Sequence, residues 1–255
     1  MPKTETQKQL SVLSLFLAIY ALLVFLTYTL FRSAVAEMAG GALPAAGADD
    51  WVIALASVAL VVVLYGLVGL AGFWFARKLG LPGIFRVGAG WNELFWLPLG
   101  IGVIVGLLLI LGDRLFVWAG DLPALPHPPF PFAIVASASA AIGEEIMFRG
   151  FVMGLWAFLL NLVLRRWHMT SVALWAANII AALAFAASHL PTVMVLYGAT
   201  SPAELPNLLV AEIFVLNTVV SLAAGWRYMT SGLVAAIGRH FWADIVWHVL
   251  WPIVQ

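Results

Sequence analysis

The chain has 255 residues, of which 64% are hydrophobic and 9% are charged. Ordinary soluble domains carry about 25% charged residues, so this composition excludes a water-soluble globular protein. The 12 basic residues balance the 12 acidic ones, and a net charge of zero argues against nucleic acid as a partner. No cysteine is present, which excludes disulfides, thiolate metal sites and a cysteine nucleophile. Any chemistry must therefore come from Ser, His, Asp or Glu side chains or from a bound ion.

Long apolar segments define the expected architecture. A helix needs about 20 residues to cross about 30 Å of hydrocarbon. The segments are continuous rather than alternating, which favours helices over strands. We predict an all-α, polytopic transmembrane helical bundle of about seven membrane helices, with eight as the alternative. The seven segments are residues 10–31, 51–76, 94–118, 132–164, 171–190, 207–226 and 231–253.

The first apolar segment and the basic residues predict the placement of the chain. A segment of over 20 residues exceeds the roughly 7 to 15 of a secretory signal core, so we expect a retained helix. Cytoplasmic loops are enriched in Lys and Arg. With the amino terminus in the cytoplasm, the basic residues near helix ends divide unequally: only Arg32 and Arg114 lie outside, and those inside are Lys3, Lys8, Arg77, Lys78, Arg86, Arg165, Arg166 and Arg227. We therefore expect an integral protein of a bacterial inner (plasma) membrane with a cytoplasmic amino terminus.

A proline-rich segment, Asp121 to Pro131, separates two regions. Its five prolines, all within residues 122–131, forbid a helix and predict an extended strap at the membrane interface. Residues 1–120 are expected to form an N-terminal three-helix membrane region with no ionisable group deep in an apolar segment. Residues 121–255 are expected to form a four-helix core within the same membrane domain.

Ionisable residues inside the apolar segments are the main functional signal. An ionised side chain at mid-bilayer costs at least about 2.5 to 3.5 kcal/mol, so such groups usually mark function. In this chain they lie in three predicted helices of the C-terminal half: Glu144, Glu145 and Arg149 in the first, His189 in the second, and His240 and Asp244 in the third.

Helical spacing predicts how these groups are used. Residues four apart share a helix face, so Glu145 and Arg149 can pair and fix the helix. Glu144 is rotated by about 100° and can face a cavity. Asp244 lies one turn after His240 and can orient its imidazole. Each pair alone also has a purely structural explanation, as a clasp between helices.

The other buried polar residues receive different predictions. Arg239 and His248 are interpreted as structural or interfacial residues. Glu212, in the sixth apolar segment, has no partner that the sequence reveals, and we expect an entry or interface role for it.

The three groups resemble the motifs of the CPBP family of intramembrane proteases, the CAAX-processing and bacteriocin-processing enzymes also called the Abi family. The family pattern is Glu-Glu-x-x-x-Arg, then Phe-x-x-x-His, then His-x-x-x-Asn or Asp. The matching residues are Glu144, Glu145 and Arg149, then Phe185 and His189, then His240 and Asp244. The resemblance covers about residues 131–250, and the first three segments match only as generic membrane spans.

The resemblance implies peptide-bond hydrolysis inside the membrane by a catalytic core in the C-terminal half. The implied catalytic group is Glu144, Glu145, Arg149, His189, His240 and Asp244, with Glu144 and His189 activating a water and His240 with residue 244 stabilising the oxyanion. The family commonly has Asn where Asp244 stands. An ionised Asp244 would repel an oxyanion, so it must be protonated, orient His240, or join a metal site. Such a site would hold zinc or a similar divalent ion on Glu144, His189, His240 and Asp244; the metal stays open.

The leading interpretation is therefore an intramembrane endopeptidase that acts on a membrane protein or peptide, including a lipidated one, within the lipid bilayer. Two other interpretations stay open. The same ionisable residues could form a relay in an ion- or proton-coupled transporter, although we find no internal repeat. A non-catalytic scaffold with the same fold is the third.

Overall fold

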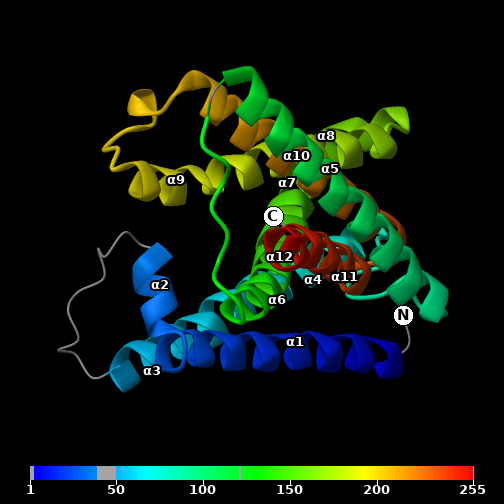
Figure 1. Cartoon of the computed structure of the whole chain (residues 1–255). Coiled ribbons are helices and arrows are strands. Elements are labelled where there is room, and N and C mark those ends of the chain that lie inside the picture. The colour runs from blue at the N-terminus through cyan, green and yellow to red at the C-terminus, as the bar shows by residue number, and fades with distance from the viewer. Residues whose placement is uncertain (1–2, 39–49, 121, 255) are drawn as a thin grey trace.

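The computed structural model describes residues 3–38, 50–120 and 122–254 of the chain (Figure 1). Within these ranges the structure contains helices and no strand, which confirms the all-α prediction for this part. Residues 1–2, 39–49, 121 and 255 lie outside the described residues. The first residue of the predicted strap, Asp121, and the extreme ends of the two predicted regions are among them.

Within the described ranges, six helical stretches are long and apolar enough to cross a membrane: Thr4–Thr29, Asp50–Leu79, Asn92–Gly120, Phe132–Trp167, Thr170–Tyr197 and Asn207–Ser231. They correspond to six of the seven predicted segments, and the chain is an integral membrane protein. The seventh predicted segment is also helical, from Leu233 to Val254, but it is not among the six. Arg239, Asp244 and two histidines make it less apolar. The count of seven or eight membrane helices stays a prediction.

Several of these stretches change helix type along their length. The N-terminal elements are α1 (Lys3–Thr29), α2 (Arg32–Met38), α3 (Asp50–Leu60), a π-helix (Val61–Tyr65), α4 (Gly66–Leu79), a second π-helix (Asn92–Trp96) and α5 (Leu97–Gly120). The C-terminal elements are α6 (Phe132–Glu144), a π-helix (Glu145–Met153), α7 (Gly154–Leu164), α8 (Thr170–Ser188), α9 (Leu190–Tyr197), α10 (Asn207–Ser231), α11 (Leu233–Asp244), a π-helix (Ile245–Leu250) and α12 (Trp251–Val254), with short 3₁₀ turns at Arg165–Trp167 and Pro202–Glu204.

Helix α11 occupies the middle of the bundle. It packs against α5, α10 and α6, and α10 in turn packs along α8. Helix α1 runs across one side, where it contacts α3 and α6 (Figure 1). Helix α4 packs on the π-helix Glu145–Met153 and on α7. Helices from the first 120 residues thus surround those that carry the buried charges, and the division into an N-terminal region and a core stays a prediction.

Small residues allow these helices to approach closely, as is usual in membrane bundles. Ala177 and Ala181 of α8 are fully buried, and Asn178 lies against Gly225 of α10. Large apolar side chains cover the outer surface instead; Trp118, for example, is 84% exposed. Because lipid is as apolar as these side chains, packing rather than hydrophobic burial must select the helix partners.

A close backbone approach joins α4 to the π-helix Glu145–Met153, and we expect Gly72→Ala to destabilise the protein. A Cβ atom at Gly72 would lie 2.6 Å from the backbone carbon of Gly150. Overpacking of this kind costs about 1 to 3 kcal/mol. Gly66 of the same helix has nothing within 4 Å of the corresponding position, so Gly66→Ala is the matched control. Reversible unfolding in mixed micelles measures both; equal stability of the two variants would contradict the prediction.

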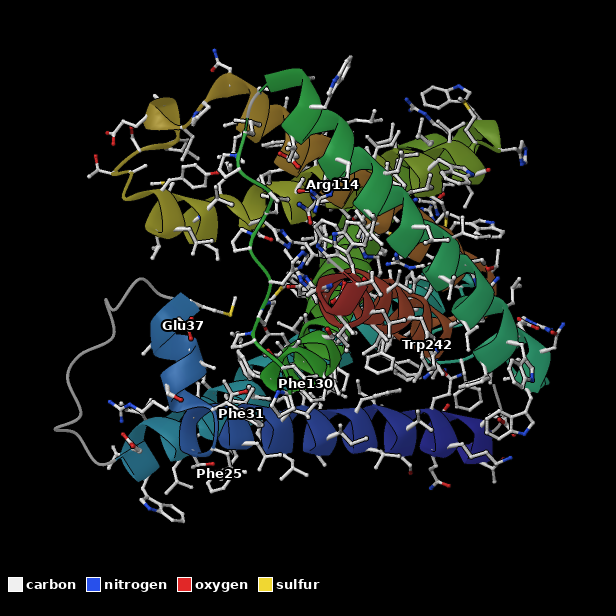
Figure 2. The ribbon with its side chains drawn as sticks, in the orientation of Figure 1. Phe25, Phe31, Glu37, Arg114, Phe130 and Trp242 are labelled. Atoms are coloured by element: carbon white, nitrogen blue, oxygen red, sulfur yellow. The ribbon has the colours of Figure 1, made fainter. Side chains whose placement is uncertain are left out.

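The proline-rich strap, defined here as residues 122–131, has no helix, as predicted. It crosses from the end of α5 to Phe130 at the start of α6 (Figures 1 and 2). The backbone N–H of Leu125 donates a hydrogen bond of 3.1 Å to Asp113 Oδ1 on α5. The strap is therefore attached to the bundle part-way along its length.

Asp113 also corrects one prediction. Its side chain is buried in α5, so the statement that residues 1–120 hold no ionisable group deep in an apolar segment is wrong. The carboxyl group of Glu212, on α10, interacts with that of Asp113 and is fully buried. The contact was invisible in the sequence because the two carboxyl groups lie on different helices, far apart along the chain.

Candidate active site

The adjacent residues Glu144 and Glu145 point in different directions, as the helical geometry predicts. Glu144 ends α6 and its side chain is 32% exposed. Glu145 begins the π-helix and is completely buried. The exposed member can therefore meet water or substrate, whereas the buried member must be neutralised by neighbouring groups.

Glu145 is neutralised mainly by Arg149. Arg149 Nε lies 3.1 Å from Glu145 Oε2, which confirms the predicted pair. The same guanidinium donates to the hydroxyl and the backbone carbonyl of Ser221 on α10, at 2.5 and 3.2 Å. Arg239 Nη2 lies 3.9 Å from Glu145 Oε1. Two buried arginines thus bracket one carboxylate, and Arg149 also ties the π-helix to α10.

Glu145 holds His240 as well. The two groups meet at 2.8 Å between Glu145 Oε1 and His240 Nδ1. A carboxylate paired with arginine only accepts hydrogen bonds, so His240 Nδ1 carries a hydrogen. His240 Nε2 then faces Asp244 Oδ1 at 3.6 Å and Glu144 Oε2 at 3.7 Å. Glu145 therefore makes the hydrogen bond at Nδ1, while Asp244 lies within ion-pairing distance of Nε2, and a role of Asp244 in orienting the ring stays a prediction.

His189 stands where α8 gives way to α9. Pro191 lies in the first turn of α9, which separates the two helices at this point. His189 Nδ1 lies 2.9 Å from the carbonyl oxygen of Phe185. Because a carbonyl only accepts, His189 Nδ1 carries a hydrogen, and in the neutral form of this ring Nε2 holds the lone pair. The Phe185 ring packs against both histidines. Its centroid lies 4.8 Å from the centroid of the His189 ring and 5.7 Å from that of the His240 ring.

The side chains of Glu144, His189, His240 and Asp244 line a single cavity of about 260 Å³. Strap residues Leu125, Pro126 and Pro128 form part of its lining, and so does His248. Asp244 is 8% exposed and His240 is 3% exposed, so the site is sheltered from bulk water. Three motifs that together span residues 144–244 of the chain therefore meet at one small cavity.

Residues 126–246 match a protein-family model described as type II CAAX prenyl endopeptidase Rce1-like. The chain carries an Rce1-like domain. The matched range includes all six candidate catalytic residues: Glu144, Glu145, Arg149, His189, His240 and Asp244. The predicted resemblance to the CAAX-processing family is confirmed. Neither the curated proteins nor the solved structures contain a match to the chain.

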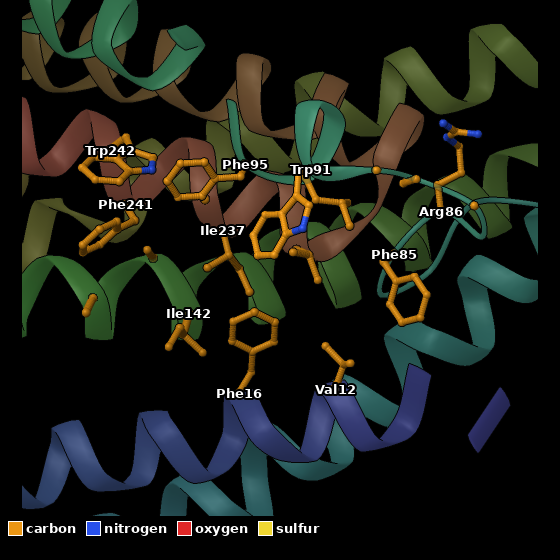
Figure 3. A pocket seen from close by; sticks show the side chains of 18 residues that line it. Val12, Phe16, Phe85, Arg86, Trp91, Phe95, Ile142, Ile237, Phe241 and Trp242 are labelled. Carbon is orange, nitrogen blue, oxygen red and sulfur yellow. The ribbon is translucent and has the colours of Figure 1, made fainter. Parts of the chain in front are cut away.

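The Rce1-like domain also borders a larger cavity of about 700 Å³ (Figure 3). Phe16 of α1, Trp91, Ile237 of α11 and Phe241 of α11 point into it. Its lining is apolar apart from Arg86 at one end. Helices α6 and α11 line both cavities with different faces, so they separate the large cavity from the site.

The side chains of the Rce1-like site do not fit a metal ion. Among the residues that the structure describes, no group of three or more His, Asp or Glu side chains is placed to hold one. His240 already uses Nδ1 for Glu145, and its Nε2 lies 3.6 Å or more from the nearest carboxylates. The predicted ligand set of Glu144, His189, His240 and Asp244 therefore lines one cavity without being arranged as a metal-binding group.

Sequence reasoning missed several residues that support the Rce1-like site. Ser221 carries no signal, since a serine in an apolar helix is common. Arg239 was interpreted as structural, yet it lies beside Glu145 and is fully buried. His127 of the strap pairs with His248 across the cavity margin. The cost of placing a polar group in an apolar segment is the signal that singles out Arg239 and His248 in the sequence, whereas Ser221 and His127 give no such signal.

Proposed function

We propose that the protein is an intramembrane endopeptidase that hydrolyses a peptide bond in a membrane-embedded or membrane-proximal substrate, including a lipidated one. The supporting observation is the convergence of Glu144, His189, His240 and Asp244 on one sheltered cavity. The Rce1-like family supports a protease. The identity of the nucleophile and the roles below are our proposal.

Glu144 is the proposed general base. Its carboxylate is the more exposed of the two glutamates and lies beyond hydrogen-bonding distance of His240. A water held between Glu144 and His189 Nε2 loses a proton to Glu144 as its oxygen attacks the peptide carbonyl carbon. Glu144 then returns that proton to the leaving amine nitrogen as the carbon–nitrogen bond breaks. The carboxyl group ends in its starting state.

His240 is the proposed donor to the oxyanion. The Nδ1–H group of His240 already donates a hydrogen bond to Glu145. Its Nε2 atom can therefore donate to the oxyanion only when the ring is an imidazolium. The carboxylates of Glu144 and Glu145 favour that positive charge. A donor aimed at a developing oxyanion in a sheltered cavity is worth about 2.7 to 4 kcal/mol.

Asp244 is proposed to act in its protonated form. Glu145 already orients His240, and the metal geometry does not fit, which leaves donation of a hydrogen bond from the carboxyl group. We expect Asp244→Asn to keep activity within about tenfold, whereas Asp244→Ala should lose about 10²-fold or more, as for other oxyanion-hole donors. Product formation by the purified protein in lipid nanodiscs, followed by mass spectrometry, measures both. Equal loss in the two variants would show that the ionised carboxylate is required.

We also propose a bacterial inner membrane location with a cytoplasmic amino terminus, on the strength of the basic residues at alternate helix ends. The chain contains no cysteine, so single cysteines can be introduced without removing native ones. A cysteine at Lys78 should be protected from a membrane-impermeant thiol reagent in intact cells, and one at Arg114 should react. The reverse labelling pattern would reverse the orientation.

A further inference from the structure

A second histidine pair lies at the margin of the catalytic cavity. His127 of the strap and His248 of the π-helix after α11 approach to 3.2 Å between their Nδ1 atoms. The His127 ring also packs edge-on against Trp247, at 4.7 Å between centroids. His248 lines the cavity together with His189 and Asp244. The proposed hydrolysis uses neither member of this pair.

The separation suits two ligands of one metal ion. Zinc binds imidazole nitrogen at about 2.0 to 2.1 Å with tetrahedral angles, which puts neighbouring nitrogens about 3.3 Å apart. Imidazole also suits copper and nickel. Metal ligation needs neutral imidazole, and a hydrogen bond between the two Nδ1 atoms already requires one of the rings to offer a lone pair.

We propose that His127 and His248 form a transition-metal site, zinc being the natural ion, that fastens the strap over the catalytic cavity. The ion takes the place of the hydrogen between the two Nδ1 atoms, and that hydrogen moves to Nε2 of the same ring. No proton is gained or lost overall. Water completes the coordination, so the ion binds less tightly than at a site with four protein ligands.

The effect on the cavity follows from where the strap is attached. Leu125, two residues before His127 in the strap, is held by its backbone hydrogen bond to Asp113 on α5. Pro126 and Pro128, on either side of His127, line the cavity. An ion at His127 therefore holds the segment whose displacement would widen access for a peptide. We expect zinc to inhibit cleavage, a consequence that rests on the proposed function, whereas binding itself does not.

Binding is tested on the full-length protein in detergent after treatment with a chelator. Zinc should raise the thermal unfolding midpoint of the wild type, and cobalt should give the visible absorption of a histidine-bound ion. Both signals should be lost in His127→Asn and in His248→Asn, which keep a polar side chain. His168→Asn is the matched control because His168 lies outside both cavities, with φ of 57°, a conformation that Asn tolerates. Signals unchanged in both site variants would overturn the proposal, as would no response in the wild type, since the pair would then be a hydrogen bond alone.

Inhibition is tested separately with a cleaved peptide substrate. Zinc at a concentration that saturates the thermal shift should reduce cleavage by the wild type and the His168→Asn variant at least tenfold, and that by His127→Asn less than twofold. Equal inhibition of all three proteins would place the inhibitory ion elsewhere and overturn the strap effect. If no protein cleaves any substrate, the proposed hydrolysis fails while the binding experiment still decides the metal site.

Discussion

Replacing Glu144 by Gln should abolish peptide cleavage and leave the protein folded. Glutamine keeps the size of the side chain but cannot accept the proton of the attacking water. Loss of a general base costs about 10² to 10⁴ in rate. The side chain is partly exposed and lies beyond hydrogen-bonding distance of His240, so its neutralisation leaves the buried pair of Glu145 and Arg149 intact. The measurement is the cleavage rate in lipid nanodiscs, with the thermal unfolding midpoint recorded on the same preparation.

Glu204→Gln is the matched control for this experiment. Glu204 lies in an exposed turn, where its carboxylate accepts hydrogen bonds from Thr200 and Ser201. This variant should cleave at the wild-type rate. Full activity in Glu144→Gln would eliminate glutamate-activated hydrolysis, and equal loss in both variants would point to a general effect of removing carboxylates.

Arg149→Met should destabilise the protein strongly. The substitution leaves Glu145 buried and removes two hydrogen bonds to Ser221. Breaking a buried ion pair by removing one partner costs about 3 to 5 kcal/mol. Arg239 remains near the carboxylate at 3.9 Å, which should keep the cost within that range rather than above it. Equilibrium unfolding in mixed micelles gives the free energy directly.

Two further variants make the measurement specific. Arg86→Met removes an arginine from an exposed pair with Glu93, and exposed pairs contribute about 0 to 1 kcal/mol. The double variant Arg149→Met with Glu145→Met removes both buried charges and should be more stable than Arg149→Met alone. A double variant that is less stable than either single one would show that the pair is not the origin of the cost.

The helices and the three motifs could be predicted from the sequence because both signals are local. Membrane spans follow from long apolar segments, and the pair of Glu145 and Arg149 follows from a spacing of four on one helix. Glu144 faces a different direction from Glu145 because adjacent residues of a helix are rotated by about 100° relative to each other. These relations depend on helix geometry alone and needed no knowledge of how the helices pack.

Contacts between helices could not be predicted in the same way. The sequence offers Asp244 as the local partner of His240, but the structure uses Glu145 from another helix. Asp113 and Glu212, or His127 and His248, are likewise brought together by packing. In the last predicted segment, packing also affects how the membrane span is recognised. Its polar residues Arg239, His240 and Asp244 are buried inside the bundle, and they make it the least apolar of the seven segments.

The change of helix type beside the two acidic residues limits how this protein can vary. Glu144 is the last residue of α6 and Asp244 is the last of α11, and each is followed at once by a π-helical stretch. In such a stretch hydrogen bonds span five residues instead of four, so it holds more residues per turn than the α-helix. Winding the same residues as α-helix would turn the preceding half of the helix relative to the rest, because an α-helix turns by about 100° per residue and a π-helix by less. The acidic side chain would then leave the cavity although every residue of its motif was retained. In this domain the lengths of the two π-helical stretches are therefore as much a part of the catalytic signature as the identities of the residues before them.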